Sequence, residues 1–188
     1  MSTAESFNLI SVDEYLLGEQ ESEVRHEYLG GVVYAMTGGT NAHAEIAINC
    51  MTSLHGQLTG KPCKVYGSDT KIRMNAAGNP RFYYPDVSVT CEPNAGSDTF
   101  QDNPILIIEV LSESTRRLDD GEKRDGYFTL PSLQYYLLLE QHSQGATFYL
   151  RNGEQWNRSI CTDPDTEFYF ELIDARLNFK TAYAGIEF

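Results

Sequence analysis

Long apolar runs and a basic leader are both missing from this 188-residue sequence. No stretch stays apolar for the roughly 20 residues that a membrane-spanning helix needs. The start, MSTAESFNLISVDEY, has neither the basic nor the apolar region of a signal peptide. We therefore expect a cytoplasmic protein with no membrane association. No repeat, low-complexity tract or linker divides the chain, so we expect one domain over residues 1–188.

Cysteine is scarce, and its spacing is irregular. The four cysteines are Cys50, Cys63, Cys91 and Cys161, and no two form a C-x-x-C pair. This spacing argues against a zinc site, and a cytoplasmic location predicts reduced thiols.

Positive charge is also scarce. Lys and Arg number 14 against 27 Asp and Glu, which gives a net charge of −13. Such a surface repels nucleic acid at long range, because non-specific DNA affinity comes from cations that neutralise phosphates. A DNA-acting function then requires a local patch or a bound metal that reverses the field at the site.

Two acids stand out in the central part of the sequence. Asp86 opens the alternating segment Tyr84–Thr90, which predicts a half-buried strand, and Glu109 lies within the otherwise apolar run Ile105–Leu111. A carboxylate in a buried strand costs several kcal/mol unless it is paired or binds a metal. Glu109 is therefore either a salt-bridged core residue or, with Asp86, a ligand of a shared divalent cation such as Mg²⁺.

A helix over Thr40–Leu58 is the clearest local prediction. Thr40 or Asn41 can cap it, and Gly60 followed by Pro62 ends it. His43 extends the apolar stripe of this helix, and it is either a satisfied core residue or a ligand.

Three further residues or segments complete the local predictions. Gly30-Gly31 predicts a hairpin turn, with Glu27 just before it as either a solvated strand residue or part of a site. Lys123 lies on a helix predicted over Gly121–Leu130, one turn before Tyr127, and is either solvated or placed beside Glu109. The other predicted elements are a capped helix at Val12–Gly18, strands at Lys64–Met74, Arg81–Thr90, Gln134–Leu139, Ala146–Leu150 and Phe168–Leu172, and polar stretches at Cys91–Pro104 and Arg151–Glu167.

These motifs resemble those of the PD-(D/E)xK nuclease superfamily, in which a metal is held by a strand Asp and a following strand Glu. That superfamily expects a lysine two residues after the second acid, where this chain has Leu111. A narrower resemblance, to the Uma-type restriction endonuclease family, covers about residues 25–136 and places the lysine on the following helix, at Lys123. The motifs that carry it are Arg25–Gly31 with Met36, His43, Tyr84–Thr90, Ile107–Ser112, Ser114-Thr115, Gly121–Arg124, Tyr127 and Leu130–Tyr136.

The resemblance implies an α/β (α+β) fold with a restriction-endonuclease-like mixed β-sheet flanked by helices. It implies Mg²⁺ or Mn²⁺ as cofactor, with Asp86, Glu109 and the backbone carbonyl of Val110 as ligands and Lys123 as a charge-stabilising or water-orienting residue. It adds Glu27 and His43 to the site and DNA as the substrate, and it leaves a homodimer open. The alternative function is a nuclease-like domain that no longer cuts and instead binds nucleic acid or assembles with proteins, because a fold does not fix a function.

Overall fold

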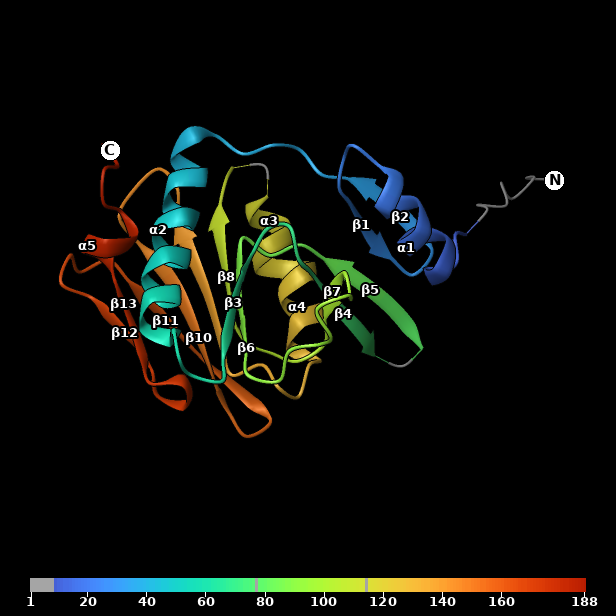
Figure 1. Ribbon diagram of the computed structural model, residues 1–188. Helices are drawn as coiled ribbons and strands as arrows, with labels where there is room; N and C mark the ends of the chain where they lie inside the picture. The colour runs from blue at the N-terminus through green and yellow to red at the C-terminus, as the bar shows by residue number, and fades with distance from the viewer. Residues whose placement is uncertain (1–8, 77, 114) are drawn as a thin grey trace.

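The computed structural model describes residues 9–76, 78–113 and 115–188, and over them the chain is a mixed α/β protein with mixed sheets flanked by helices (Figure 1). The largest sheet has six strands in the order β11-β10-β9-β8-β6-β3. Its pairings are antiparallel except for the parallel pair β8–β9. Its strands are β3 (Lys64–Gly67), β6 (Val87–Thr90), β8 (Pro104–Leu111), β9 (Tyr135–Glu140), β10 (Ala146–Asn152) and β11 (Gln155–Cys161).

A helical segment, here called the crossover helix, connects the two parallel strands β8 and β9, as a parallel pair requires. It consists of α3 (Arg116–Leu118), a π-helical turn η1 (Asp119–Lys123) and α4 (Arg124–Phe128). This segment begins earlier than the predicted Gly121 and ends before Leu130. It covers one face of the six-stranded sheet, where Tyr127 packs with Ile107 and Leu111 of β8.

A five-stranded sheet in the order β2-β1-β5-β4-β7 packs on the same side. Its strands are β1 (His26–Leu29), β2 (Val32–Ala35), β4 (Lys71–Ala76), β5 (Asn79–Tyr83) and β7 (Phe100–Gln101). The predicted hairpin turn is confirmed, since Gly30 and Gly31 have φ of +55° and +101° between β1 and β2. Helix α1 (Val12–Glu21) covers the outer face through Tyr15, and the predicted capping box at Ser11 is present.

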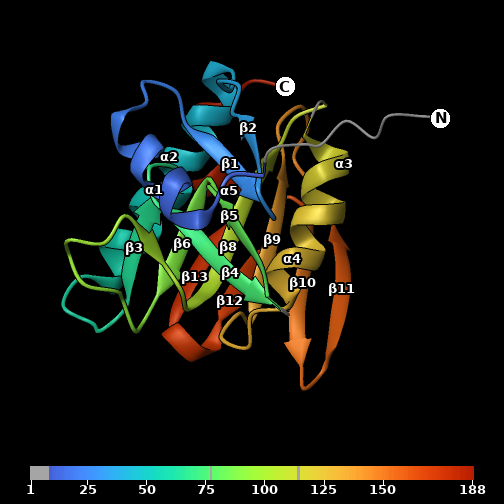
Figure 2. The ribbon, with the colours of Figure 1, turned by 90° about the vertical axis from the view of Figure 1, so that its right-hand side faces the viewer.

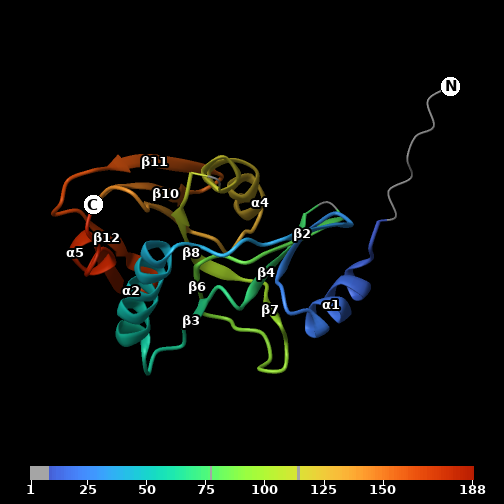
Figure 3. The ribbon, with the colours of Figure 1, turned by 90° about the horizontal axis from the view of Figure 1, so that it is seen from above.

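The opposite face of the six-stranded sheet is covered by α2 (Asn41–Leu58), capped by Thr40 as predicted. Figure 3 shows α2 and α4 on opposite sides of the sheet. Helix α2 buries Ile46, Cys50, Leu54 and Leu58 against the sheet and the C-terminal elements. Those elements are β12 (Glu167–Phe170), the 3-10 turn η2 (Glu171–Ile173), β13 (Ala175–Asn178) and α5 (Phe179–Ala182).

Several predicted strands are wrong in extent. The segment Arg81–Thr90 is two strands, because the chain leaves the five-stranded sheet after β5 and enters the six-stranded sheet at β6 (Figure 2). Pro85 lies at this change and cannot donate a ladder hydrogen bond. The segment Lys64–Met74 is likewise divided between β3 and β4, and all four β6 residues are buried rather than alternating.

Two stretches predicted as polar connections contain strands. The Cys91–Pro104 stretch contains β7, and the Arg151–Glu167 stretch contains β11. Strand β11 lies at the sheet edge, and most of its side chains are exposed. Backbone pairing with β10 defines this strand, and its sequence has no apolar pattern that would predict it. Of the residues in the predicted motifs, Ser114 lies outside the described part of the chain.

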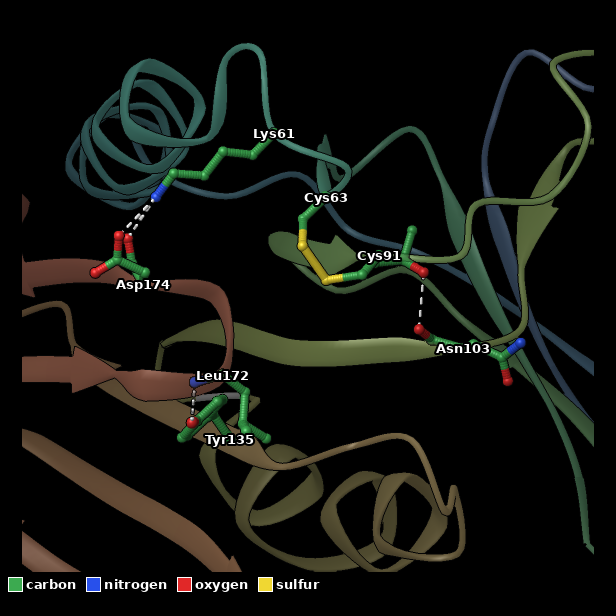
Figure 4. Close-up of a disulfide and its surroundings, with 8 residues drawn as sticks. Lys61, Cys63, Cys91, Asn103, Tyr135, Leu172 and Asp174 are labelled. Atoms are coloured by element: carbon green, nitrogen blue, oxygen red, sulfur yellow. Dashed lines mark hydrogen bonds and ion pairs between the residues drawn. A yellow bond between two sulfur atoms is a disulfide. The ribbon is translucent and has the colours of Figure 1, made fainter.

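The prediction of four reduced thiols is wrong for two cysteines. Cys63 and Cys91 form a disulfide (Figure 4). Because β3 and β6 are antiparallel and Lys64 is paired with Thr90, these cysteines are brought face to face at the ends of the two strands. Cys50 and Cys161 are free. Within the described part of the chain, no helix is both long and apolar enough to cross a membrane.

Candidate active site

Asp86 and Glu109 are brought together by the pairing of β6 with β8. Val87 is paired with Ile108, so Asp86 enters β6 directly across from Glu109, as predicted. The Asp86 backbone N–H donates to Glu109 Oε2 (3.2 Å), and the Val110 N–H donates to Asp86 Oδ2 (2.7 Å). These reciprocal bonds fix both carboxylates at the end of the β6–β8 pair.

His43 reaches this pair from the first turn of α2. Its Nε2 lies 2.9 Å from Asp86 Oδ1, and the hydrogen bond to Asp86 raises the pKa of His43 above its ordinary value. Its Nδ1 is buried and has no hydrogen-bond partner among the described residues. His43 is therefore partnered with the strand acid.

Lys123, the last residue of the π-helical turn η1, is also buried in this cluster. Its Nζ lies 2.7 Å from Glu27 Oε1 and 3.4 Å from Asp119 Oδ1. Both of these oxygens are buried, and neither has a partner of hydrogen-bond geometry. The positive charge of Lys123 therefore stabilises them by its proximity. π-Turns recur at functional sites, and here the turn η1 has Asp119 at its start and the lysine at its end.

Of the two alternatives for Glu27, the structure excludes a solvated strand residue. Glu27 lies on β1 with 7% of its surface exposed and faces the helical crossover. Sequence reasoning missed Asp119, which is 3% exposed. The one available signal was the spacing of Asp119 and Lys123, four residues apart on a helical segment, which places both side chains on one face.

The cluster holds more negative than positive charge. Four carboxylates, those of Glu27, Asp86, Glu109 and Asp119, surround the single ammonium of Lys123, and the nearby His43 is the other titratable base. Burial raises the pKa of Glu27, Glu109 and Asp119, while the lysine charge opposes this increase. Burial alone would lower the pKa of Lys123, but Glu109, Glu27 and Asp119 outweigh it and raise that pKa.

A pocket of about 180 Å³ opens onto the cluster. Asp86, Glu109, Lys123 and Asp119 line it, together with the segment 36–40 that joins β2 to α2. In Figure 1 this segment runs from the five-stranded sheet across to the start of α2. The pocket is therefore bounded by β8 of the six-stranded sheet, the start of α2, the crossover helix and this connection, so a ligand in it reaches every charged residue predicted for the site except Glu27.

The chain also matches a known protein family. The model of the Uma2 family, described as "Putative restriction endonuclease", matches residues 12–174. This chain belongs to the Uma2 family.

Relatives and a solved structure extend the match. Two uncharacterized proteins of Synechocystis sp. are 38% and 29% identical to this Uma2 chain, over 154 and 177 residues. The alignments cover 81% of the chain and 80% of the first relative, and 92% of the chain and 99% of the second. A crystal structure described as a putative nuclease belonging to DUF820, from Anabaena variabilis, has a TM-score of 0.75 at 17% identity. It covers 93% of this chain and 98% of that one, which shows that the two share a fold.

In this Uma2 chain the crossover helix brings Lys123 beside Glu109 of β8, and position 111 is Leu. Leu111 lies on the same face of β8 as Glu109, and the crossover helix packs on that face. The helix therefore delivers Lys123 to the face where a strand lysine would lie. It reaches the face of β8 rather than an edge, because β8 is paired on both sides, with β6 and β9. Tyr127 packs the helix down, as predicted, and its hydroxyl donates to Glu109 Oε1 at 3.2 Å.

Proposed function

We propose that this protein is a Mg²⁺- or Mn²⁺-dependent nuclease that hydrolyses DNA phosphodiester bonds at the pocket beside Asp86 and Glu109. One observation carries the proposal: four carboxylates and one ammonium are gathered in a largely buried cluster. An excess of buried negative charge is unfavourable unless a cation or protons neutralise it.

The donors of the cluster suit a hard divalent cation. Carboxylate and carbonyl oxygens are the ligands that Mg²⁺ and Mn²⁺ take, and Mg²⁺ keeps several waters. Within the described residues, no three His, Cys, Asp or Glu side chains already converge as a ligand group. In this proposal, Asp86 and Glu109 would hold the ion, and the Val110 carbonyl and water would complete its ligands. Bound there, such an ion would neutralise charge and would supply Lewis-acid activation of water for phosphodiester hydrolysis.

The side chains of the chain itself supply the rest of the chemistry. Lys123 Nζ has one proton beyond those facing Glu27 and Asp119, and it can donate to a non-bridging phosphate oxygen. Glu27 and Asp119 position this ammonium and keep it charged. His43 orients the Asp86 carboxylate through its 2.9 Å contact.

A non-cutting function has one specific observation in its favour. The ammonium of Lys123 is already shared among acidic neighbours, and the whole chain carries a net charge of −13. In this alternative the cluster binds a cation and a ligand without hydrolysing it. The two functions agree on metal binding and differ in cleavage, so they can be separated.

Thermal melting with and without Mn²⁺ tests the metal site, because a ligand that binds the native state stabilises it. Wild type should melt higher with Mn²⁺ than with chelator. Asp86→Asn and Glu109→Gln should each lose this shift and remain folded. Asp165→Asn is the matched control, because this acid is exposed at 81% and pairs only with Lys180 in the described structure. If both site variants keep the wild-type shift, the metal lies elsewhere.

Cleavage assays on plasmid, single-stranded DNA and RNA then test the activity. The nuclease proposal expects metal-dependent cleavage by wild type and none by either site variant. A protein that shows the thermal shift but leaves all three substrates intact is the non-cutting alternative.

A further inference from the structure

A second pocket, of about 370 Å³, adjoins the acidic pocket. Its volume lies in the range of about 300–1,000 Å³ typical of sites for organic ligands. Both pockets are lined by Met36, Thr37, Thr115 and Lys123, so they share a wall. A group in the second pocket therefore lies directly beside a group in contact with Lys123.

The walls of this second pocket are largely apolar and aromatic. They include Leu29, Tyr34, Tyr83 and Leu118. Tyr34 of β2 is 53% exposed and is paired across the hairpin with Glu27. Because directly paired residues point to one face of a sheet, the Tyr34 ring lies on the same face as the carboxylate that holds Lys123. An exposed ring beside the charged cluster offers a flat surface for stacking.

A third, wider groove continues on the far side. It shares Leu118 and Glu122 with the second pocket and is lined by Arg81 and Arg117. Arg81 is half-buried and Arg117 is exposed, and among the described residues neither lies within 4 Å of a carboxylate. Neither guanidinium is therefore neutralised by a contacting carboxylate.

The three hollows are thus the acidic pocket beside Lys123, a largely apolar pocket, and a groove in which Arg81 and Arg117 lie with Glu122 and Asp125. We propose that they bind an unpaired nucleic-acid strand, with one base stacked on Tyr34 and the next phosphate held by Arg81 and Arg117. This inference rests on the proposed function for the phosphate beside Lys123. The base must be unpaired, because a base inside the pocket is out of reach of a complementary strand. A single strand also brings fewer phosphates than a duplex to the acidic surface.

Fluorescence anisotropy with a labelled single-stranded oligonucleotide and the same sequence as a duplex tests the proposal, with Ca²⁺ present so that binding is measured rather than cleavage. Wild type should bind the single strand more tightly than the duplex. Tyr34→Ala should weaken single-strand binding about 5-fold to 100-fold, the range for loss of one base–aromatic stack, and Tyr34→Phe should restore it. Tyr169→Ala is the matched control, because Tyr169 is 45% exposed on β12.

The two arginines have a different signature. Arg81→Ala and Arg117→Ala should each weaken binding and lower the slope of log affinity against log salt by about one, because each loses one phosphate contact. Arg176→Ala, which removes a surface arginine paired with Glu167, should leave the slope unchanged.

An oligonucleotide series with a single abasic site links the pocket to Tyr34. One abasic position should weaken wild-type binding as much as Tyr34→Ala does, and should cause no further loss in that variant.

The inference is overturned if Tyr34→Ala binds as wild type does, or if the duplex binds as well as the single strand. If the protein binds Mn²⁺ and cuts duplex DNA while the Tyr34 and arginine variants bind normally, the inference alone fails. If Tyr34-dependent binding occurs without metal-dependent cleavage, the proposed function fails and the strand site stands.

Discussion

Two lysine–carboxylate pairs of this protein differ almost entirely in their surroundings. Lys123 and Glu27 are 2.7 Å apart with side chains 8% and 9% exposed, whereas Lys180 and Asp165 are 3.1 Å apart and 77% and 81% exposed. Water screens the second pair, which makes such contacts worth about 0–1 kcal/mol. Around the first pair further carboxylates are buried, so removal of the single ammonium leaves their charge uncompensated. Similar contacts therefore have a structural and chemical role in one place and almost none in the other.

Lys123→Ala should produce the largest effect on this comparison. In chelator it should lower the free energy of unfolding by about 3–5 kcal/mol, as expected when one partner of a buried ion pair is removed. Urea denaturation measures this loss, and Mn²⁺ should recover part of it, because the proposed metal ligands Asp86 and Glu109 remain. Cleavage at saturating substrate should decrease about 10²–10³-fold, since a charge-stabilising donor acts on the chemical step.

The matched control for that prediction is Lys64→Ala, which removes an exposed lysine from β3. It should change neither stability nor cleavage measurably at fixed salt. Cleavage by Lys123→Ala at the wild-type rate would show that the helix lysine has no catalytic role.

Tyr127→Phe should have a smaller effect, which sharpens the comparison within the cluster. The hydroxyl of Tyr127 donates to buried Glu109, and its loss removes a partner of a desolvated carboxylate, at a cost of about 1–3 kcal/mol. The same change at exposed Tyr169, whose hydroxyl contacts Asp174, should not alter the urea midpoint. Equal effects of the two substitutions would remove burial as the explanation.

Lys180→Ala should have the smallest effect, within about 0.5 kcal/mol of wild type. Urea denaturation in low and high salt measures it, and salt should erase any difference, because the pair is exposed. A loss as large as that of Lys123→Ala would contradict the distinction between the two environments.

Local sequence signals predicted the elements that place half of the candidate site. Thr40 as a cap and Gly60 with Pro62 as terminators bounded α2, the Gly30-Gly31 pair bounded the β1–β2 hairpin, and the apolar run around Glu109 indicated β8. Each signal depends on residues within a few positions, where capping, left-handed backbone and burial pattern act. Residue by residue, the resemblance to the Uma-type family supplied the pairing of Asp86, Glu109 and Lys123 that local patterns left open.

Other features depended on residues far apart in sequence. From the sequence alone, Asp119 resembles a solvated acid. In the folded chain it is 3% exposed and lies on the crossover helix beside Lys123. Strand β11 has no apolar pattern, because pairing with β10 alone defines it. The disulfide follows from the register of β3 against β6, which no spacing of cysteines reveals.

The sequence by itself indicated α2, the β1–β2 hairpin and β8, and that a carboxylate would be buried in β8. Only the tertiary structure decided which charges surround that carboxylate, because burial and pairing are properties of surfaces that meet after folding. The parallel β8–β9 pair requires a crossover, and the crossover lays Asp119, Lys123 and Tyr127 on the face that carries Glu109. The candidate site is therefore a consequence of sheet topology acting on residues that are individually ordinary.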